Sequence, residues 1–171
     1  IELKQELSPK NLELYKLWSS QNIEAYPAPK KATEPTKDEI EKLRLWEEQG
    51  CISPYTMKPI PLSMLFSPER LYDIDHIIPK SRFFDDSASN KVVCETNINE
   101  EKSNRTAWEY ISQQNSTFKI CSIESYIEHI NRIFYGKKKK NLLLEKIPTN
   151  PVERQLKDTQ YISIAVKNEL A

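Results

Sequence analysis

Two stretches in the first third of the chain carry hydrophobic residues at helical spacing, at 11–21 and at 36–50. Thr36 has a side chain suited to capping the start of the second helix, and Gly50 can adopt the left-handed conformation that ends one. Between the two stretches, three prolines within 26–36 are typical of a linker. The pattern therefore predicts two helices joined by an irregular connection.

Near the middle of the chain the spacing changes from helical to alternating. Residues 71–78 alternate polar and apolar at their centre, and 91–96 contain consecutive apolar residues, so we expect two strands. Four prolines between 51 and 68 exclude a long helix there and favour short extended pieces. Helical spacing returns at 97–114, where Asn97 and Glu100 resemble a capping box. The expected order is strand, long loop, strand, helix.

The last third of the chain predicts two more helices. A hydrophobic stripe at 123–134 is followed by Gly136, which we interpret as a helix stop. His129 falls off this stripe, so we expect it to face solvent. The four lysines at 137–140 are interpreted either as a solvated turn or as a phosphate-binding patch. A final helix is expected to begin at 150–151, where proline takes the first helical position.

Composition narrows the class of protein. The chain has 171 residues, enough for one compact domain with flanking segments, and its 38% hydrophobic and 29% charged residues suit a helix-rich soluble domain. No apolar run is long enough to span a bilayer, so we expect no membrane partner. The chain starts at Ile1 rather than at methionine, which suggests excision from a longer parent.

Charge and cysteine content limit the possible partners further. Lys+Arg total 25 and Asp+Glu total 25, and a net charge of zero would not by itself hold the protein on nucleic acid. Cys51, Cys94 and Cys121 are distant and odd in number, which argues against a disulfide framework and for a reducing cytoplasm. Without a CxxC pair, a structural zinc site is also not expected.

Asp75 and His76 lie side by side in the first predicted strand and have the side chains that phosphodiester cleavage needs. A carboxylate offers hard oxygen ligands to a magnesium-like ion, and an imidazole can accept a proton near neutral pH. Neighbours on a strand point to opposite faces, so the pair can converge only if the chain bends, as Pro79 allows. Asn99, in the first turn of the next helix, would supply a second oxygen ligand.

Other polar residues near this pair are candidates for supporting roles. Asn90 precedes the second strand and can hydrogen-bond loop backbone groups, thereby holding His76 in orientation. Lys91, Lys102 and Arg105 flank the site and are candidates for phosphate contacts, with solvated surface charge an equal alternative for each. Each residue alone has an ordinary explanation as a surface, turn or helix residue. Their order and spacing together favour the catalytic interpretation.

Several segments around these residues together resemble the HNH domain of type II CRISPR effector nucleases (the Cas-nine family). They are YDIDHIIPKS at 72–81, DDS at 85–87, NKV at 90–92, Asn99 and Lys102-Ser103. Residues 45–49 and 53–60 resemble the segment that precedes this motif, and 154–162 resemble the connector that re-enters the RuvC-like domain. Generic HNH nucleases share only the short Asp-His and Asn core, so the flanking matches indicate the family.

The resemblance implies an α+β, mostly helical fold with an HNH ββα-metal core, a two-stranded antiparallel hairpin plus a helix, and added helices. It also implies that His76 is the general base, that Asp75 and Asn99 bind Mg²⁺, with Mn²⁺ as a substitute, and that Asn90 is the middle Asn of the motif. In this family the domain cuts the DNA strand that is paired to the guide RNA. Glutamates at 100–101 replace residues that are basic in many relatives, which weakens the case for a phosphate grip on that turn.

We therefore expect residues 37–149 to be the nuclease domain, 1–36 an N-terminal helix and linker from the RuvC-like part, and 150–171 a linker helix towards it. The leading hypothesis is a magnesium-dependent DNA endonuclease domain of a bacterial, cytoplasmic, RNA-guided effector. Its partners would be target-strand DNA in a guide RNA–DNA heteroduplex and the rest of the parent protein, and the isolated domain would be monomeric.

Two rival hypotheses remain at this point. A free-standing homing or restriction-type HNH endonuclease would need its own DNA-reading module, and the sequence offers no zinc finger, basic helix or excess positive charge for one. A non-catalytic nucleic-acid-binding module would have kept the fold and lost the activity, but the chain retains Asp75, His76 and Asn99.

Overall fold

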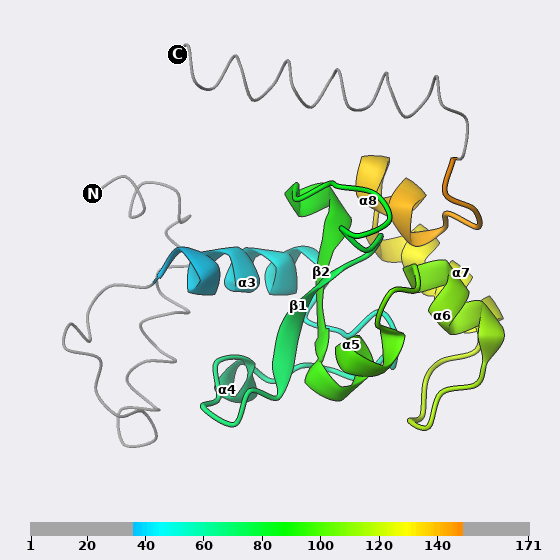
Figure 1. Cartoon of the computed structure of the whole chain (residues 1–171). Helices are drawn as coiled ribbons and strands as arrows, with labels where there is room; N and C mark the ends of the chain where they lie inside the picture. The colour runs from blue at the N-terminus through cyan, green and yellow to red at the C-terminus, as the bar shows by residue number, and fades with distance from the viewer. Residues whose placement is uncertain (1–35, 149–171) are drawn as a thin grey trace, which may run out of the picture.

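The structure is a computed structural model, and it describes residues 36–148. A two-stranded sheet lies at the centre of this part of the chain, with helices on either side of it (Figure 1). The helix expected at 11–21, most of the linker at 26–36 and the helix expected from 150 onward lie outside the described residues. No helix within 36–148 is long and apolar enough to cross a membrane.

Six α-helices, one short 3-10 helix and two strands form the described part of the fold. In chain order they are α3 (Lys37–Glu48), α4 (Leu62–Leu65), β1 (Tyr72–His76), η1 (Ala88–Asn90), β2 (Lys91–Glu95), α5 (Thr96–Lys102), α6 (Ala107–Gln113), α7 (Ile123–Ile133) and α8 (Gly136–Leu142). The strands β1 and β2 with helix α5 form the ββα core, and the remaining helices are additions. The expected α+β, mostly helical class is confirmed.

The two strands pair in antiparallel register, and this register positions the end of β1. Asp75 lies opposite Val92, and His76 lies opposite Lys91. The strand ends at His76, and one further hydrogen bond in the same register follows it, from the Ile77 amide to the carbonyl oxygen of Asn90 at 2.9 Å. Both predicted strands are therefore present, and the first is shorter than the alternating pattern suggested.

Two hydrophobic clusters pack against the sheet. The first lies among β2 and α5 to α8 and includes Val92, Cys94, Ile98, Tyr110, Ile130 and Leu142. The second lies between α3, α4 and the other face of β2 and includes Leu43, Trp46, Leu65 and Val93. Because successive strand residues point to opposite faces, Val92 and Val93 belong to different clusters. Strand β2 is buried on both faces, which explains its consecutive apolar residues.

Helix α3 begins and ends at the residues expected from the sequence. Thr36 and Glu39 form a capping box, in which the Glu39 carboxylate accepts from the Thr36 amide at 2.9 Å and the Thr36 hydroxyl accepts from the Glu39 amide at 3.2 Å. At the other end Gly50 has a φ of +69°, the left-handed conformation that glycine adopts without strain. These local signals predicted the helix correctly.

The single helix expected at 97–114 is wrong, because the chain forms two helices there. Ser103 has a φ of +49° and ends α5, and a new capping box formed by Thr106 and Glu109 starts α6. The Ala107 amide donates to the carbonyl oxygen of Ile77 at 2.9 Å, which ties the break to the end of β1. The capping box expected at Asn97 is also absent, since Glu95 is the N-cap of α5 and makes no side-chain cap bond.

Gly136 does not act as the stop of α7, and the lysines after it do not form a turn. Helix α7 ends at Ile133, and Gly136, with a φ of +61°, is the first residue of α8. Lys138 is buried and lies 2.6 Å from Glu48 of α3, while Lys137 lies 2.8 Å from Asp85. The helix therefore uses two of the four lysines to bind other parts of the domain.

His129 is buried, contrary to the solvent-facing position expected from helical spacing. Its side chain is 1% exposed, and neither ring nitrogen has a hydrogen-bond partner among the described residues. The ring contacts that of Phe134 edge-on, with centroids 6.5 Å apart. Burial, together with the nearby charge of Arg132, lowers the pKa of His129.

We predict that His129 makes the stability of the domain depend on pH. Because its pKa is lower in the folded state, the unfolded chain takes up the proton first as the pH falls below about 6.5, and stability is lost from there downward. His129→Leu should raise the free energy of unfolding by about 1 kcal/mol at pH 7.5, since it removes buried unpaired nitrogens. The gain should grow at pH 5.

Urea unfolding of the wild type and of His129→Leu at both pH values measures this effect. His76 is present in both proteins, so its titration cancels in the difference. An equal difference at pH 7.5 and pH 5 would contradict the prediction.

Candidate active site

Asp75, His76 and Asn99 line one pocket beside the end of β1. The pocket has a volume of about 330 Å³, and its wall is completed by Ile74, Pro79, Lys80, Ser81, Ser103 and Asn104. Residues from the strand, from the loop after it and from α5 therefore meet at one place. Asp75 and His76 both line this pocket although they are neighbours on β1, whose last residue is His76.

The Asp75 carboxylate is held by two buried donors. Its side chain is 3% exposed, and Oδ1 accepts from the Lys102 ammonium at 3.0 Å while Oδ2 accepts from the Tyr55 hydroxyl at 2.6 Å. Lys102 is 1% exposed and also donates to the carbonyl oxygen of His76 at 2.8 Å. A buried charge is tolerated only when it is paired and hydrogen-bonded, and Asp75 and Lys102 meet that condition for each other.

Tyr55 is a site residue that the sequence did not indicate. Its ring is fully buried and lies edge-on to Tyr110 at a centroid distance of 5.8 Å. Burial first, and then the negative charge of Asp75, raise the pKa of Tyr55 well above its usual value. The phenol therefore keeps its proton and remains a donor to Asp75. In the sequence, the one feature that singles out Tyr55 is its position in the segment that precedes the motif.

His76 is the more exposed member of the pair. Its side chain is 25% exposed, and Nε2 lies 2.9 Å from Oδ1 of Asp86, a residue of the loop after β1. The same oxygen lies 2.9 Å from Lys80 and 3.3 Å from Lys91. Hydrogen bonds from Lys80 and then from His76 hold the pKa of Asp86 well below its usual range. Asp86 is a second site residue whose part in the site was not foreseen.

Asn90 holds the loop after β1 by its side chain, as its position suggested. The side chain is fully buried, its oxygen accepts from the Ile78 amide at 2.9 Å, and its nitrogen donates to the carbonyl oxygens of Ile78 and Asp85 at 2.9 Å each. These bonds fix the chain that immediately follows His76. No bond to the His76 ring is present among the described residues, so any orienting effect of Asn90 is exerted through the backbone.

Asn99 lies at the junction of two hollows on the surface. Besides the pocket with His76, it lines a neighbouring hollow of about 540 Å³ together with Lys42, Phe66, Arg70 and Asp73. Within residues 36–148 the side-chain amide of Asn99 makes no hydrogen bond. The backbone oxygen of Asn99 accepts one from the Ser103 amide. The side-chain amide is therefore available to a ligand in the pocket.

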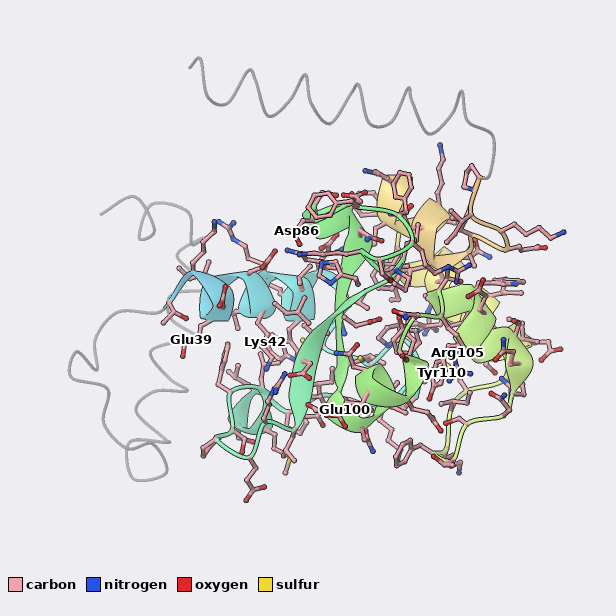
Figure 2. All side chains as sticks on the ribbon, viewed as in Figure 1. Glu39, Lys42, Asp86, Glu100, Arg105 and Tyr110 are labelled. Atoms are coloured by element: carbon pink, nitrogen blue, oxygen red, sulfur yellow. The ribbon has the colours of Figure 1, made fainter. Side chains whose placement is uncertain are left out.

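Of the three candidates for phosphate contacts, Lys102 is paired with Asp75, and the other two also lie against protein partners. Lys91 is buried and lies 2.7 Å from Glu41 of α3. The Arg105 guanidinium lies 4.9 Å from the ring centroid of Tyr110, beside it in Figure 2, and donates to Gln113 at 2.9 Å. A phosphate would have to replace these contacts to bind either residue.

Glu101, which departs from the basic residues of many relatives, is used to anchor a loop. Its carboxylate accepts from the hydroxyls of Ser116, Thr117 and Tyr110 and from the Thr117 amide. Burial alone would raise its pKa, but these hydrogen bonds lower the pKa of Glu101 to about 2. The residue therefore fastens the segment after α6 to α5.

Comparison with known proteins gives concordant results. The family model for HNH endonucleases matches residues 53–108. The chain is 33% identical over 135 residues to CRISPR-associated endonuclease Cas9 1 of Streptococcus thermophilus, covering 75% of this chain and 12% of that protein. It is 35% identical over 142 residues to Cas9 of Staphylococcus aureus, covering 76% and 13%.

A solved structure is also similar. The crystal structure of Streptococcus thermophilus Cas9 in complex with AGGA PAM superposes with a TM-score of 0.62 at 30% identity, covering 94% of this chain and 16% of that one. The chain thus spans roughly one eighth of the length of the curated relatives that it matches.

We predict that Lys102→Met strongly destabilises the domain. The change leaves the Asp75 carboxylate buried without its counter-ion, and breaking a buried pair in this way costs about 3–5 kcal/mol. The double variant Asp75→Asn/Lys102→Met removes both charges and should recover most of the loss. Urea unfolding measures all three proteins. A loss below about 1 kcal/mol in the single variant would show that the ion pair is not a structural element.

Proposed function

Because the chain belongs to the HNH endonuclease domains of Cas9 proteins, we propose that it is the metal-dependent nuclease domain of a larger RNA-guided effector and cuts the DNA strand paired to the guide RNA. The observation that carries this proposal is the pocket shared by Asp75, His76 and Asn99. It combines a proton acceptor with two oxygen ligands, which is the minimum set for hydrolysis of a phosphodiester with one metal ion.

In the proposed reaction His76 accepts a proton from a water molecule in the pocket. The imidazole is partly exposed and lines the pocket, so it can reach such a water. The resulting hydroxide attacks the phosphorus, and the bond to the leaving oxygen of the deoxyribose breaks. The backbone around His76 is held by Lys102 and Asn90, so the ring enters the reaction from a fixed position.

Asp75 and Asn99 would hold the metal ion, and their chemistry fits Mg²⁺ or Mn²⁺. Both offer oxygen atoms, and magnesium commonly binds one or two protein ligands and keeps several waters. Within 36–148 no group of three or more acidic, His or Cys side chains that could hold a metal ion is present. The proposed protein ligands are therefore Asp75 and Asn99. A bound ion would supply positive charge for the phosphate oxygens and the leaving group. Lys102 is paired with Asp75 and would therefore compete with the ion for this carboxylate.

The remaining partners follow from the same proposal. A chain with 25 basic and 25 acidic residues attracts a polyanion weakly, so the parent protein would supply the affinity for the guide RNA–DNA heteroduplex. The alternatives are a free-standing HNH endonuclease and a non-catalytic nucleic-acid-binding module. Weak cleavage by the 171-residue chain alone and strong cleavage by the parent favour the effector, whereas strong cleavage by the chain alone favours the free-standing enzyme.

We predict that the chain binds Mn²⁺ and that Asn99→Ala weakens this binding about tenfold or more. The Asn99 amide makes no hydrogen bond within the described residues, so its removal should leave the free energy of unfolding nearly unchanged. Isothermal titration of wild type and variant with Mn²⁺ measures the affinity, and Asp73→Asn, on the same strand as Asp75, is a control for loss of a neighbouring carboxylate. No heat with the wild type would favour the non-catalytic module.

We predict that His76→Ala in the full-length protein abolishes cleavage of the guide-paired strand. A general base contributes about 10²–10⁴-fold to the rate, and alanine cannot accept the proton. DNA binding should stay the same, because the variant keeps the fold and the parent's contacts. A gel assay of strand cleavage beside a binding assay measures both, and cutting near the wild-type rate would show that His76 is not the base.

A further inference from the structure

The carboxylate of Asp86, a residue of the loop that follows β1, lies 2.9 Å from Nε2 of the His76 imidazole. We propose that Asp86 is a positioning residue that holds His76 with its proton on Nε2, so that Nδ1 carries the free lone pair that accepts a proton from water. This inference rests on the proposed role of His76 as the base. It adds a residue to the site and assigns the nitrogen that reacts.

The side chain of Asp86 is 46% exposed, and its contacts with three neighbours restrain it on the loop. Its Oδ1 lies 2.9 Å from Nε2 of His76, 2.9 Å from the ammonium of Lys80 and 3.3 Å from that of Lys91. Lys91 is itself buried and lies 2.7 Å from Glu41 of α3. Asp86 is therefore fastened to the loop by Lys80 and to the interior of the domain by Lys91.

The sheet register places two of these groups on the same rung. His76 is the last residue of β1, and its partner across the sheet is Lys91, the first residue of β2. The carboxylate of Asp86 bridges the two side chains at this end of the sheet. A movement of the imidazole relative to β2 would break this bridge. The ring is thereby linked to β2 through Asp86 and Lys91.

The location of the proton follows from the charge of Asp86. Two ammonium groups lie close to one of its oxygens, and hydrogen bonds from Lys80, from His76 itself and from Lys91 hold the pKa of Asp86 well below its usual range, so the group is a carboxylate without a proton to donate. The hydrogen in the bond to His76 must then belong to Nε2. In a neutral imidazole only one nitrogen carries hydrogen, and the other is an acceptor. The acceptor is Nδ1.

The same argument assigns a role to Lys91 and Lys80. Lys80 lines the pocket, and Lys91 lies opposite His76 across the sheet. Both have the charge that a phosphate contact requires, but each is paired with Asp86. Their charge keeps Asp86 ionised and oriented. In this arrangement they act on the reaction through Asp86 and His76.

Nuclear magnetic resonance of the ¹⁵N-labelled 171-residue chain tests the proposal without any measurement of activity. His76 should show a protonated Nε2, an unprotonated Nδ1 and a resolved Nε2–H proton signal protected from exchange. In Asp86→Ala that proton signal should be lost to exchange with water. His129, the second of two histidines, is the internal reference, and Asp73→Asn is the control for loss of another nearby carboxylate.

Two results would overturn the proposal. One is a wild-type His76 with its proton on Nδ1, and the other is an Nε2–H signal that survives unchanged in Asp86→Ala. If Asp86→Ala does not fold, Asp86→Asn replaces it, because the amide keeps an oxygen acceptor of the same length. Asp86→Asn should keep the Nε2–H signal at a shifted frequency with faster exchange, and an unshifted, equally protected signal would overturn the proposal as well.

Kinetics of the full-length protein separate this proposal from the proposed function. Asp86→Ala should lower kcat about 10–100-fold with KM nearly unchanged, and Asp86→Asn should lose less. Active His76→Ala would refute the general-base function whatever Asp86 does. Inactive His76→Ala together with fully active Asp86→Ala would refute only the positioning role.

Discussion

The buried ion pair of Asp75 and Lys102 is the interaction on which the rest of the site depends. Transfer of either charge from water is costly, so each side chain can stay buried only in the position that the other allows. Tyr55 adds a third segment of the chain to the same carboxylate. The Asp75 carboxylate of strand β1 is therefore in contact with helix α5 and with the segment before α4. Asp75 also lines the pocket, so the same charged side chain stabilises the fold and belongs to the proposed active site.

Elements with local signals were predicted well, and elements set by distant contacts were not. Helix α3 and the two strands follow from spacing and caps within a few residues. The break between α5 and α6 is accompanied by a hydrogen bond from the Ala107 amide to the carbonyl oxygen of Ile77, thirty residues earlier. The spacing of hydrophobic residues does not indicate such a distant contact. His129 was misplaced for a similar reason. Helical periodicity identifies the main buried face of α7, but not a second surface that packs against it.

The site divides in the same way. Asp75, His76 and Asn99 were expected to meet because they belong to a short motif with fixed spacing, and all three line one pocket; their catalytic roles stay predictions. Tyr55 and Asp86 were not expected there, because each acts through a hydrogen bond to a residue 20 or 10 positions away, and a tyrosine or aspartate in a loop has many other uses. A basic residue near a motif is equally ambiguous in sequence, since burial and pairing decide what its charge does.

Pairing also limits how much of the positive charge near the site can attract a phosphate backbone. Lys80, Lys91 and Lys102 each have a carboxylate partner, and Arg105 is held by Gln113 and the ring of Tyr110. Their charge orients internal groups, so little of it remains to attract a phosphate backbone. A domain built in this way is suited to a substrate delivered by another part of the protein. The internal pairing of these charges thus agrees with the proposal that a larger effector supplies the affinity for nucleic acid.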